Sequence, residues 1–420
     1  MTNALTLGAA LAPANNKEKK LGTRSSLTFK ANVNSGRYGW LRLTPAYSFN
    51  LVNSVLSDYP SGSVVLEPFS GSATTPLVAA NMGLNVYARE INPFLVWFGQ
   101  AKTASYSPDD LELTAVVLDE IADNAPAIKD FDALWQPDIF HIERWWSEAN
   151  LSALKAIRSL IDETDGQVRN LLDVAFCREL IACSNATFNH PSMGFKKQSE
   201  SLHSFDYSYK EVIDAYVREA QMVIETAAAV PQGECKIELG DSCRPFSPEI
   251  QADIVLTSPP YANRMSYIRE LRPYMYWMRF LNTGQEAGEL DWDTIGGTWG
   301  SATTKLKSWK GEVETPIDEA VDDVCSKIIQ GKSGEVLSPY VRKYFYDMWQ
   351  HFTSIKPAIK DGGRICYIVG NSTFSGTMVP AQEWYAEMMR SAGFKDVHIE
   401  TIRKRNCNKQ LYEYAVEARK

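Results

Sequence analysis

The sequence predicts an α/β fold in which helices cover both faces of a doubly wound, mostly parallel sheet. Residues 63–102 contain two consecutive strand–helix units, and such alternation is typical of parallel sheets. Apolar strands return within residues 235–256 and at residues 363–369. The long segments between them carry apolar residues at helical spacing, which indicates largely helical insertions.

The first predicted strand, residues 64–67, ends in a turn of small residues. Glycine and serine in that turn let the backbone approach a bulky ligand closely. A helix follows, and Gly83 supplies its end signal. The next strand closes on Glu90, about 20 residues after the glycine turn, where a carboxylate suits a ribose diol. A generic nucleotide-binding domain, such as that of a nicotinamide-dependent dehydrogenase, would carry the same pattern.

The predicted strand at residues 252–256 runs into Ser258, Pro259, Pro260 and Tyr261. Two prolines stop a strand and keep the backbone extended, because proline fixes φ and donates no N–H. The carbonyls of Ser258 and Pro259 can then accept hydrogen bonds from a ligand, and Tyr261 offers a flat face for a ring. The four residues predict a site for an amino group on a planar ring. Prolines also end strands in ordinary loops, but a dehydrogenase has no use for this sequence.

Together these segments resemble the DNA amino-methyltransferases that use S-adenosylmethionine (SAM). The first motif of that family, roughly D-P-F-x-G-S-G-T-T, is matched by residues 67–75, and the second by residues 90–93. Residues 239–242 look like the third motif, Ser-Pro-Pro-Tyr like the catalytic fourth, and residues 42–45 like the motif that completes the cofactor pocket. The resemblance covers about residues 25–105, 235–281 and 360–420.

The resemblance implies a Rossmann-like sheet of the SAM-dependent methyltransferase type, with SAM as cofactor. It assigns methyl transfer to Ser258, Pro259, Pro260 and Tyr261. It assigns cofactor binding to Thr44, Pro45, Glu67, Pro68, Phe69, Ser70, Gly71, Ser72, Thr74, Thr75, Glu90, Ile91, Asn92, Asp241 and Ser242. Two positions depart from the family: Glu67 replaces an aspartate and Ala73 replaces the last glycine. The methyl group of Ala73 is expected to narrow the cofactor pocket.

The implied reaction methylates an exocyclic amine of a DNA base that has been flipped out of the duplex. Methylation at cytosine carbon 5 would need a nucleophilic cysteine, typically after a proline, and no cysteine here follows one. In the resembled family, serine at the position of Ser258 is commoner in cytosine-N4 enzymes, which favours cytosine N4. Three alternatives remain open: an adenine-N6 enzyme, an RNA or protein-amide N-methyltransferase, and a non-catalytic nucleic-acid-binding partner.

Double-stranded DNA is the expected partner, although the net charge of the chain is −8. Phosphate contacts come from local patches, so a negative total does not exclude them. The candidate contacts are Arg264, Arg269, Arg272, Lys196, Lys197, Lys305 and Lys307. Most lie in or beside two polar, basic segments, residues 184–206 and 296–310, whose aromatic residues could fill the gap left by a flipped base. These segments could equally be surface loops.

We expect residues 25–105 and 235–420 to form the catalytic domain, ending in an antiparallel hairpin. Residues 106–234 are a predicted helical insertion and residues 283–335 a second one; both are candidate DNA-contact regions. The third and fourth motifs are too close together for a recognition domain between them.

A reducing cytoplasm is the expected location, since seven cysteines show no pairing pattern. No apolar run is long enough to cross a membrane, and the first 20 residues lack the order of a signal peptide. Cys177, Cys183, His190 and His203 have irregular spacing, so no metal site is predicted. The sequence leaves open a cognate restriction endonuclease encoded nearby and the oligomeric state.

Overall fold

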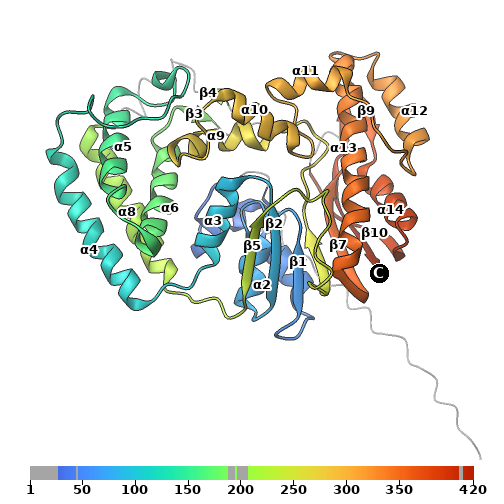
Figure 1. The fold of residues 1–420 in the computed structure, drawn as a ribbon, viewed down its shortest axis with the longest axis horizontal. Helices are drawn as coiled ribbons and strands as arrows, with labels where there is room; N and C mark the ends of the chain where they lie inside the picture. Colours follow the sequence, from blue (N-terminus) through green and yellow to red (C-terminus); the bar gives the residue numbers. More distant parts are fainter. Residues whose placement is uncertain (1–26, 44–45, 188–193, 196–206, 406–409) are drawn as a thin grey trace, which may run out of the picture.

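The computed structural model describes residues 27–43, 46–187, 194–195, 207–405 and 410–420 (Figure 1). Its centre is a seven-stranded sheet in the order β10-β11-β7-β6-β1-β2-β5. The strands are β1 (Val64–Glu67), β2 (Asn85–Glu90), β5 (Cys235–Leu239), β6 (Ala252–Thr257), β7 (Ile359–Gly370), β10 (Lys395–Lys404) and β11 (Tyr412–Arg419). The five strands from β5 to β7 are parallel, and β11 and β10 add antiparallel pairs. The predicted sheet and its C-terminal hairpin are confirmed.

Successive residues of the central strands face opposite layers of helices. Val65 and Ile254 belong to a core shared with α1 (Phe49–Leu56) and α2 (Thr74–Asn81). Their neighbours Leu66 and Val255 belong to a second core, shared with α12 (Asp318–Ile328), α13 (Gly334–Ile355) and α14 (Ala381–Ser391). Both faces of the sheet are therefore covered, as a doubly wound fold requires.

A third core belongs to the first insertion, which lies beside the β5 edge of the sheet (Figure 1). It is helical, as predicted, and includes α4 (Pro108–Asn124), α5 (Glu148–Ile161), α6 (Gly166–Ala182) and α8 (Tyr209–Ala227). A two-residue ladder joins β3 (Ala186–Thr187) to β4 (Gly194–Phe195). Phe94 and Phe98 of α3 (Pro93–Thr103) enter the same core, so the insertion is joined to the sheet through apolar packing.

The second insertion crosses above the carboxyl ends of the central strands (Figure 1). Its first helices are α10 (Gly284–Asp293) and α11 (Ser301–Ser308), and α9 (Tyr267–Trp277) precedes it. The remaining elements are the hairpin of β8 (Ser372–Phe374) and β9 (Thr377–Val379), and the 3-10 helices η1 (Phe29–Ala31), η2 (Gly36–Gly39), η3 (Ala125–Ala127), η4 (Ile142–Arg144) and η5 (Lys356–Ala358). Among the described residues, no helix combines the length and apolar character needed to cross a membrane.

Candidate functional site

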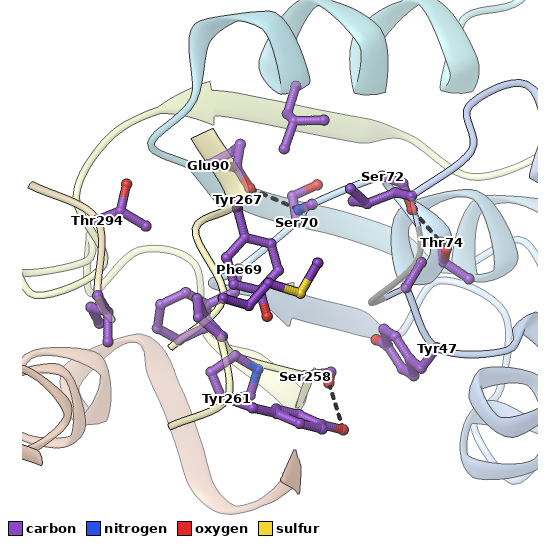
Figure 2. A pocket seen from close by; sticks show the side chains of 18 of the residues that line it. Tyr47, Phe69, Ser70, Ser72, Thr74, Glu90, Ser258, Tyr261, Tyr267 and Thr294 are labelled. Carbon is purple, nitrogen blue, oxygen red and sulfur yellow. Dashed lines mark hydrogen bonds between the residues drawn. The ribbon is translucent and has the colours of Figure 1, made fainter. Parts of the chain in front are cut away.

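A cavity of about 620 Å³ opens at the carboxyl ends of the parallel strands, where sheets of this kind bind ligands. It is lined by the segments that directly follow four strands: residues 68–72 after β1, 90–92 after β2, 241–242 after β5 and 258–261 after β6. Figure 2 shows Glu90 and Ser70 on one side of this cavity, and Ser258 and Tyr261 on the other. The structure therefore gathers most of the predicted cofactor and catalytic residues around one space.

Glu90 joins the two turns on its side of the cavity. Its Oε2 accepts a hydrogen bond of 2.8 Å from the Gly71 amide, and its Oε1 accepts one of 3.0 Å from the Asn92 amide. Gly71 has a φ of +51°, which glycine adopts without strain. Burial raises the pKa of the Glu90 carboxyl, while these amides act in the opposite direction. A carboxylate oxygen has two lone pairs, so each oxygen keeps acceptor capacity for a ligand.

Ala73 does not narrow the cavity, and that expectation is wrong. Its side chain is fully buried in the core beneath the turn and does not line the cavity. The space it needs comes from Gly99 on α3, where an added Cβ would lie 3.2 Å from the Cβ of Ala73 and 2.7 Å from Ile237 Cδ1. The methyl group thus points into the protein, away from any cofactor.

Glu67 and Thr75 lie behind the cavity wall instead of lining it. Glu67 accepts hydrogen bonds from the Phe69 amide at 3.0 Å, from the Tyr47 hydroxyl at 3.1 Å and from the Thr257 hydroxyl. Tyr47, which does line the cavity, also contacts the Thr75 hydroxyl. Burial raises the pKa of Glu67 to about 7. This network ties the segment before α1 to the ends of β1 and β6, so both residues support the site from behind.

Ser242 and Phe69 are held by a histidine that the sequence analysis did not single out. Ser242 donates a hydrogen bond to the Pro68 carbonyl, and its own carbonyl accepts one of 2.8 Å from His351 Nδ1. His351 Nε2 then accepts from the Tyr367 hydroxyl at 2.5 Å. Burial lowers the pKa of His351 to about 4, so the ring is neutral. The Phe69 ring meets the His351 ring edge-on at 4.8 Å, which fixes the wall next to Asp241.

The loop of residues 258–261 is held by α13. The Tyr344 hydroxyl donates to the Pro260 carbonyl at 2.6 Å, and the Tyr340 hydroxyl accepts from the Arg264 amide at 3.0 Å. No donor among the described residues reaches the Pro259 carbonyl. The Ser258 hydroxyl donates to the Ile368 carbonyl at 3.2 Å, and its oxygen can still accept hydrogen bonds. Two adjacent residues thus each offer a hydrogen-bond acceptor, the side-chain oxygen of Ser258 and the main-chain oxygen of Pro259.

Tyr261 forms the floor on this side of the cavity (Figure 2). Its hydroxyl donates to Glu413 Oε1 at 2.8 Å, and the Arg405 guanidinium lies 5.4 Å from its ring centroid. Burial, together with the Glu413 carboxylate, raises the pKa of the Tyr261 phenol well above its usual value. The phenol therefore stays protonated and keeps donating.

The predicted DNA contacts differ in their surroundings. Arg264 is exposed beside the loop of residues 258–261. Arg272 lies between the rings of Trp145 and Trp299, at 5.2 and 5.3 Å, and Arg269 is half-buried on the same helix. Lys307 forms an ion pair with Glu335 at 3.1 Å, and Lys305 lies 5.3 Å from the Trp292 ring.

Several predicted residues lie outside the described part of the chain: Thr44, Pro45, Lys196 and Lys197, and likewise His190 and His203. Cys177 and Cys183 are buried in the core of the first insertion. No group of three metal-binding side chains occurs among the residues that the structure describes.

Three type II methyltransferases are similar to this chain at 21% identity. M.BsoBI of Geobacillus stearothermophilus aligns with 95% of this chain and 87% of its own length. M.MvaI of Kocuria varians aligns with 84% and 79%, and M.AvaI of Nostoc sp. with 59% and 55%. No family model matches the chain. The rRNA methyltransferase AviRa of Streptomyces viridochromogenes, a solved structure, aligns over 90% of this chain and 89% of its own at 12% identity, but the TM-score of 0.26 is too low to indicate a common fold.

These matches agree with the four motifs and with the cavity that the motifs surround. Two of the relatives align with more than four-fifths of the chain, so the likeness extends across the sheet and the insertions. The chain therefore resembles the type II methyltransferases over most of its length, with S-adenosylmethionine as the methyl donor.

Proposed function

We propose that this protein transfers a methyl group from SAM to the N4 amine of a cytosine flipped out of duplex DNA. One observation carries the proposal: the loop of residues 258–261 and the glycine turn of residues 68–72 face a single cavity of about 620 Å³. Transfer between two bound molecules requires such a space, because donor and acceptor must lie in line. The resemblance of the motifs and the relatives, which are type II methyltransferases, support methyl transfer without deciding the base.

The cofactor would occupy the side of the cavity formed by the turns after β1, β2 and β5. Its methionine end would lie along residues 69–72, its ribose hydroxyls against Glu90, and its adenine amino group against Asp241. Glu90 is suited to this role, because two backbone amides already hold its carboxylate in place. Asp241 is likewise fixed, since its Oδ1 accepts from the Cys243 amide at 2.8 Å.

The target amine would donate its two N–H groups to the Ser258 hydroxyl oxygen and the Pro259 carbonyl. These hydrogen bonds would turn the amine lone pair out of conjugation with the ring and toward the cofactor. When bound, SAM supplies an electrophilic methyl group on a sulfonium. The amine nitrogen, held by Ser258 and Pro259, would gain the methyl group as the methyl–sulfur bond breaks, and would then release a proton to solvent. Tyr261 would stack on the base, and such stacking contributes about 1–3 kcal/mol per base.

Cytosine N4 is preferred over adenine N6 because serine at position 258 is commoner in the cytosine-N4 branch of the resembled family. Ala73 does not line the cavity, so it gives no support to the non-catalytic alternative. An RNA or amide substrate remains the other alternative.

Mass spectrometry of nucleosides tests these choices together. DNA and RNA from cells expressing the wild type would be digested, with cells expressing Ser258→Ala as the matched control. We expect N4-methylcytosine in the DNA of wild-type cells only. N6-methyladenine in its place would overturn the choice of base, and methylation confined to RNA, or none, would overturn DNA as the substrate.

A further inference from the structure

The C-terminal hairpin supplies a wall of the cavity, although none of its residues belongs to the four motifs. Arg403, Arg405 and Glu413 line the cavity together with Tyr261. Glu413 is 4% exposed. Burying a carboxylate so completely is costly unless it is paired and hydrogen-bonded, so its partners indicate what it does.

Among the residues that the structure describes, the Glu413 carboxylate has two hydrogen-bonding partners. Its Oε1 accepts the Tyr261 hydroxyl at 2.8 Å. Arg403 approaches from the opposite position on the neighbouring strand, with Nε 2.6 Å from Oε2 and a terminal nitrogen 3.2 Å from Oε1. The arginine neutralises the carboxylate and holds it by two hydrogen bonds, which is the strongest geometry such a pair adopts. The carboxylate is thereby fixed where the tyrosine hydroxyl meets it.

A tether at the hydroxyl fixes the plane of the Tyr261 ring. A tyrosine side chain has two rotatable bonds before the ring, and a hydrogen bond at its far end restricts both. We propose that Glu413 is a positioning residue, which holds the Tyr261 ring in the orientation that a flipped base needs for stacking. This inference rests on the proposed function for its effect on catalysis, but the contact itself does not depend on the substrate.

The alternative is that Glu413 and Arg403 merely stabilise the hairpin, and the same strand provides a control for it. Glu417, four residues along β11, is also buried and pairs with Arg364 at 2.7 Å. That ion pair joins β11 to β7, and neither of its residues lines the cavity. Removing either glutamate costs an ion pair, but only Glu413 contacts Tyr261.

The test is a double-mutant cycle on turnover, with tritiated SAM and saturating unmethylated bacteriophage DNA. We expect Glu413→Met and Tyr261→Phe each to lower kcat by about tenfold, as the loss of one hydrogen bond to a charged group allows. The double variant should be no slower than either single one, because Glu413 acts through the hydroxyl that Tyr261→Phe removes. The affinity of these variants for SAM, measured by calorimetry, should not change.

The control variant Glu417→Met should lower the melting temperature about as much as Glu413→Met does and leave kcat within about twofold. If Glu413→Met does not fold, Glu413→Gln, which keeps the shape of the side chain, serves in the same comparison.

The positioning role would be overturned if the losses of kcat in Glu413→Met and Tyr261→Phe multiplied in the double variant. It would also be overturned if Glu417→Met lost as much kcat as Glu413→Met. A second measurement is independent of DNA. With 3-fluorotyrosine incorporated at position 261, the fluorine resonance should shift and broaden in Glu413→Met and stay unchanged in Glu417→Met. An unchanged resonance in Glu413→Met would overturn the inference even if the wild type methylated DNA. Absence of DNA methylation by the wild type, with the shift present, would instead count against the proposed function alone.

Discussion

The two sides of the cavity are built in different ways. In the proposed cofactor wall, residues 68–72, 90–92 and 241–242, main-chain amides of the turns hold Glu90, and His351 of α13 contacts Ser242 and Phe69. The acceptor wall, residues 258–261, depends on side chains from distant segments, among them Tyr344 of α13 and Glu413 of β11. The hydrogen bonds of Glu90 can be encoded in short motifs, whereas the acceptor wall requires the whole fold to be in place.

Of the substitutions proposed here, Ser258→Ala should have the largest effect, and it should change turnover without changing SAM affinity. Loss of the hydroxyl removes an acceptor of the target amine, so kcat should fall by about 100-fold, similar to the loss of one preorganised polar group in other active sites. Affinity for SAM should stay unchanged, because the cofactor wall is untouched. Calorimetry with SAM and turnover with tritiated SAM measure the two quantities, and wild-type turnover would remove Ser258 from the reaction.

Glu90→Ala should have the opposite pattern. Hydrogen bonds to a charged acceptor contribute about 1.5–3 kcal/mol, so the Kd for SAM should rise by about 10- to 100-fold. Tyr261→Phe is the matched control on the other wall and should bind SAM like the wild type. Calorimetry on both variants decides the point: equal SAM affinity in the two would show that Glu90 does not hold the ribose.

Arg264→Ala should change DNA binding modestly and equally on all sequences. Arg264 is exposed next to the acceptor wall, and loss of one phosphate contact lowers the slope of log affinity against log salt by about one unit. Lys307 is already paired with Glu335, so Lys307→Ala should keep the wild-type slope. Titrations of both variants with duplex DNA at several salt concentrations provide the measurement. A reduced slope for Lys307→Ala alone would shift the DNA surface to α11.

Ala73→Gly should have the smallest effect. Ala73 has a φ of +54°, which is strained for a side chain, but its methyl group fills space in the core. These terms oppose each other, so the free energy of unfolding should change by less than about 1 kcal/mol. Gly99→Ala should cost about 1–3 kcal/mol because the added methyl meets Ile237. Denaturant titration measures the free energy of unfolding of both variants. A gain in SAM affinity for Ala73→Gly would show that the Ala73 methyl group does narrow the cavity.

The sequence predicted the central strands, the C-terminal hairpin and the cofactor wall, because each follows from a short pattern. It predicted neither α13 nor the hairpin of β8 and β9. Tyr340, Tyr344 and Met348 recur at helical spacing and could have indicated α13, but Pro339 and the many aromatic residues obscure the pattern. Arg264 has a φ of +62° and Ser266 caps α9, so the helix after Tyr261 begins only at Tyr267.

The role of Glu413 could not be predicted, because it depends on tertiary packing. Tyr261 and Glu413 are far apart in the chain, and only the register of β11 between β7 and β10 brings the carboxylate to the hydroxyl. A shift of that register by one residue would turn Glu413 to the other face of the sheet. No local pattern in residues 410–420 contains this information.

Asp291, a buried residue of α10, joins the second insertion to Ser266, which lies just after the loop of residues 258–261. Its carboxylate accepts from the Ser266 hydroxyl at 2.5 Å and from the Trp299 amide at 2.7 Å, and its backbone leaves no room for a side chain at Gly297. Ser266 in turn caps the helix that follows the loop. A chimera that exchanged residues 283–335 for those of a relative would remove this carboxylate from Ser266 unless Asp291 were kept. If this insertion reads DNA, as we propose it could, an exchange of sequence specificity would therefore have to keep Asp291 together with the exchanged residues.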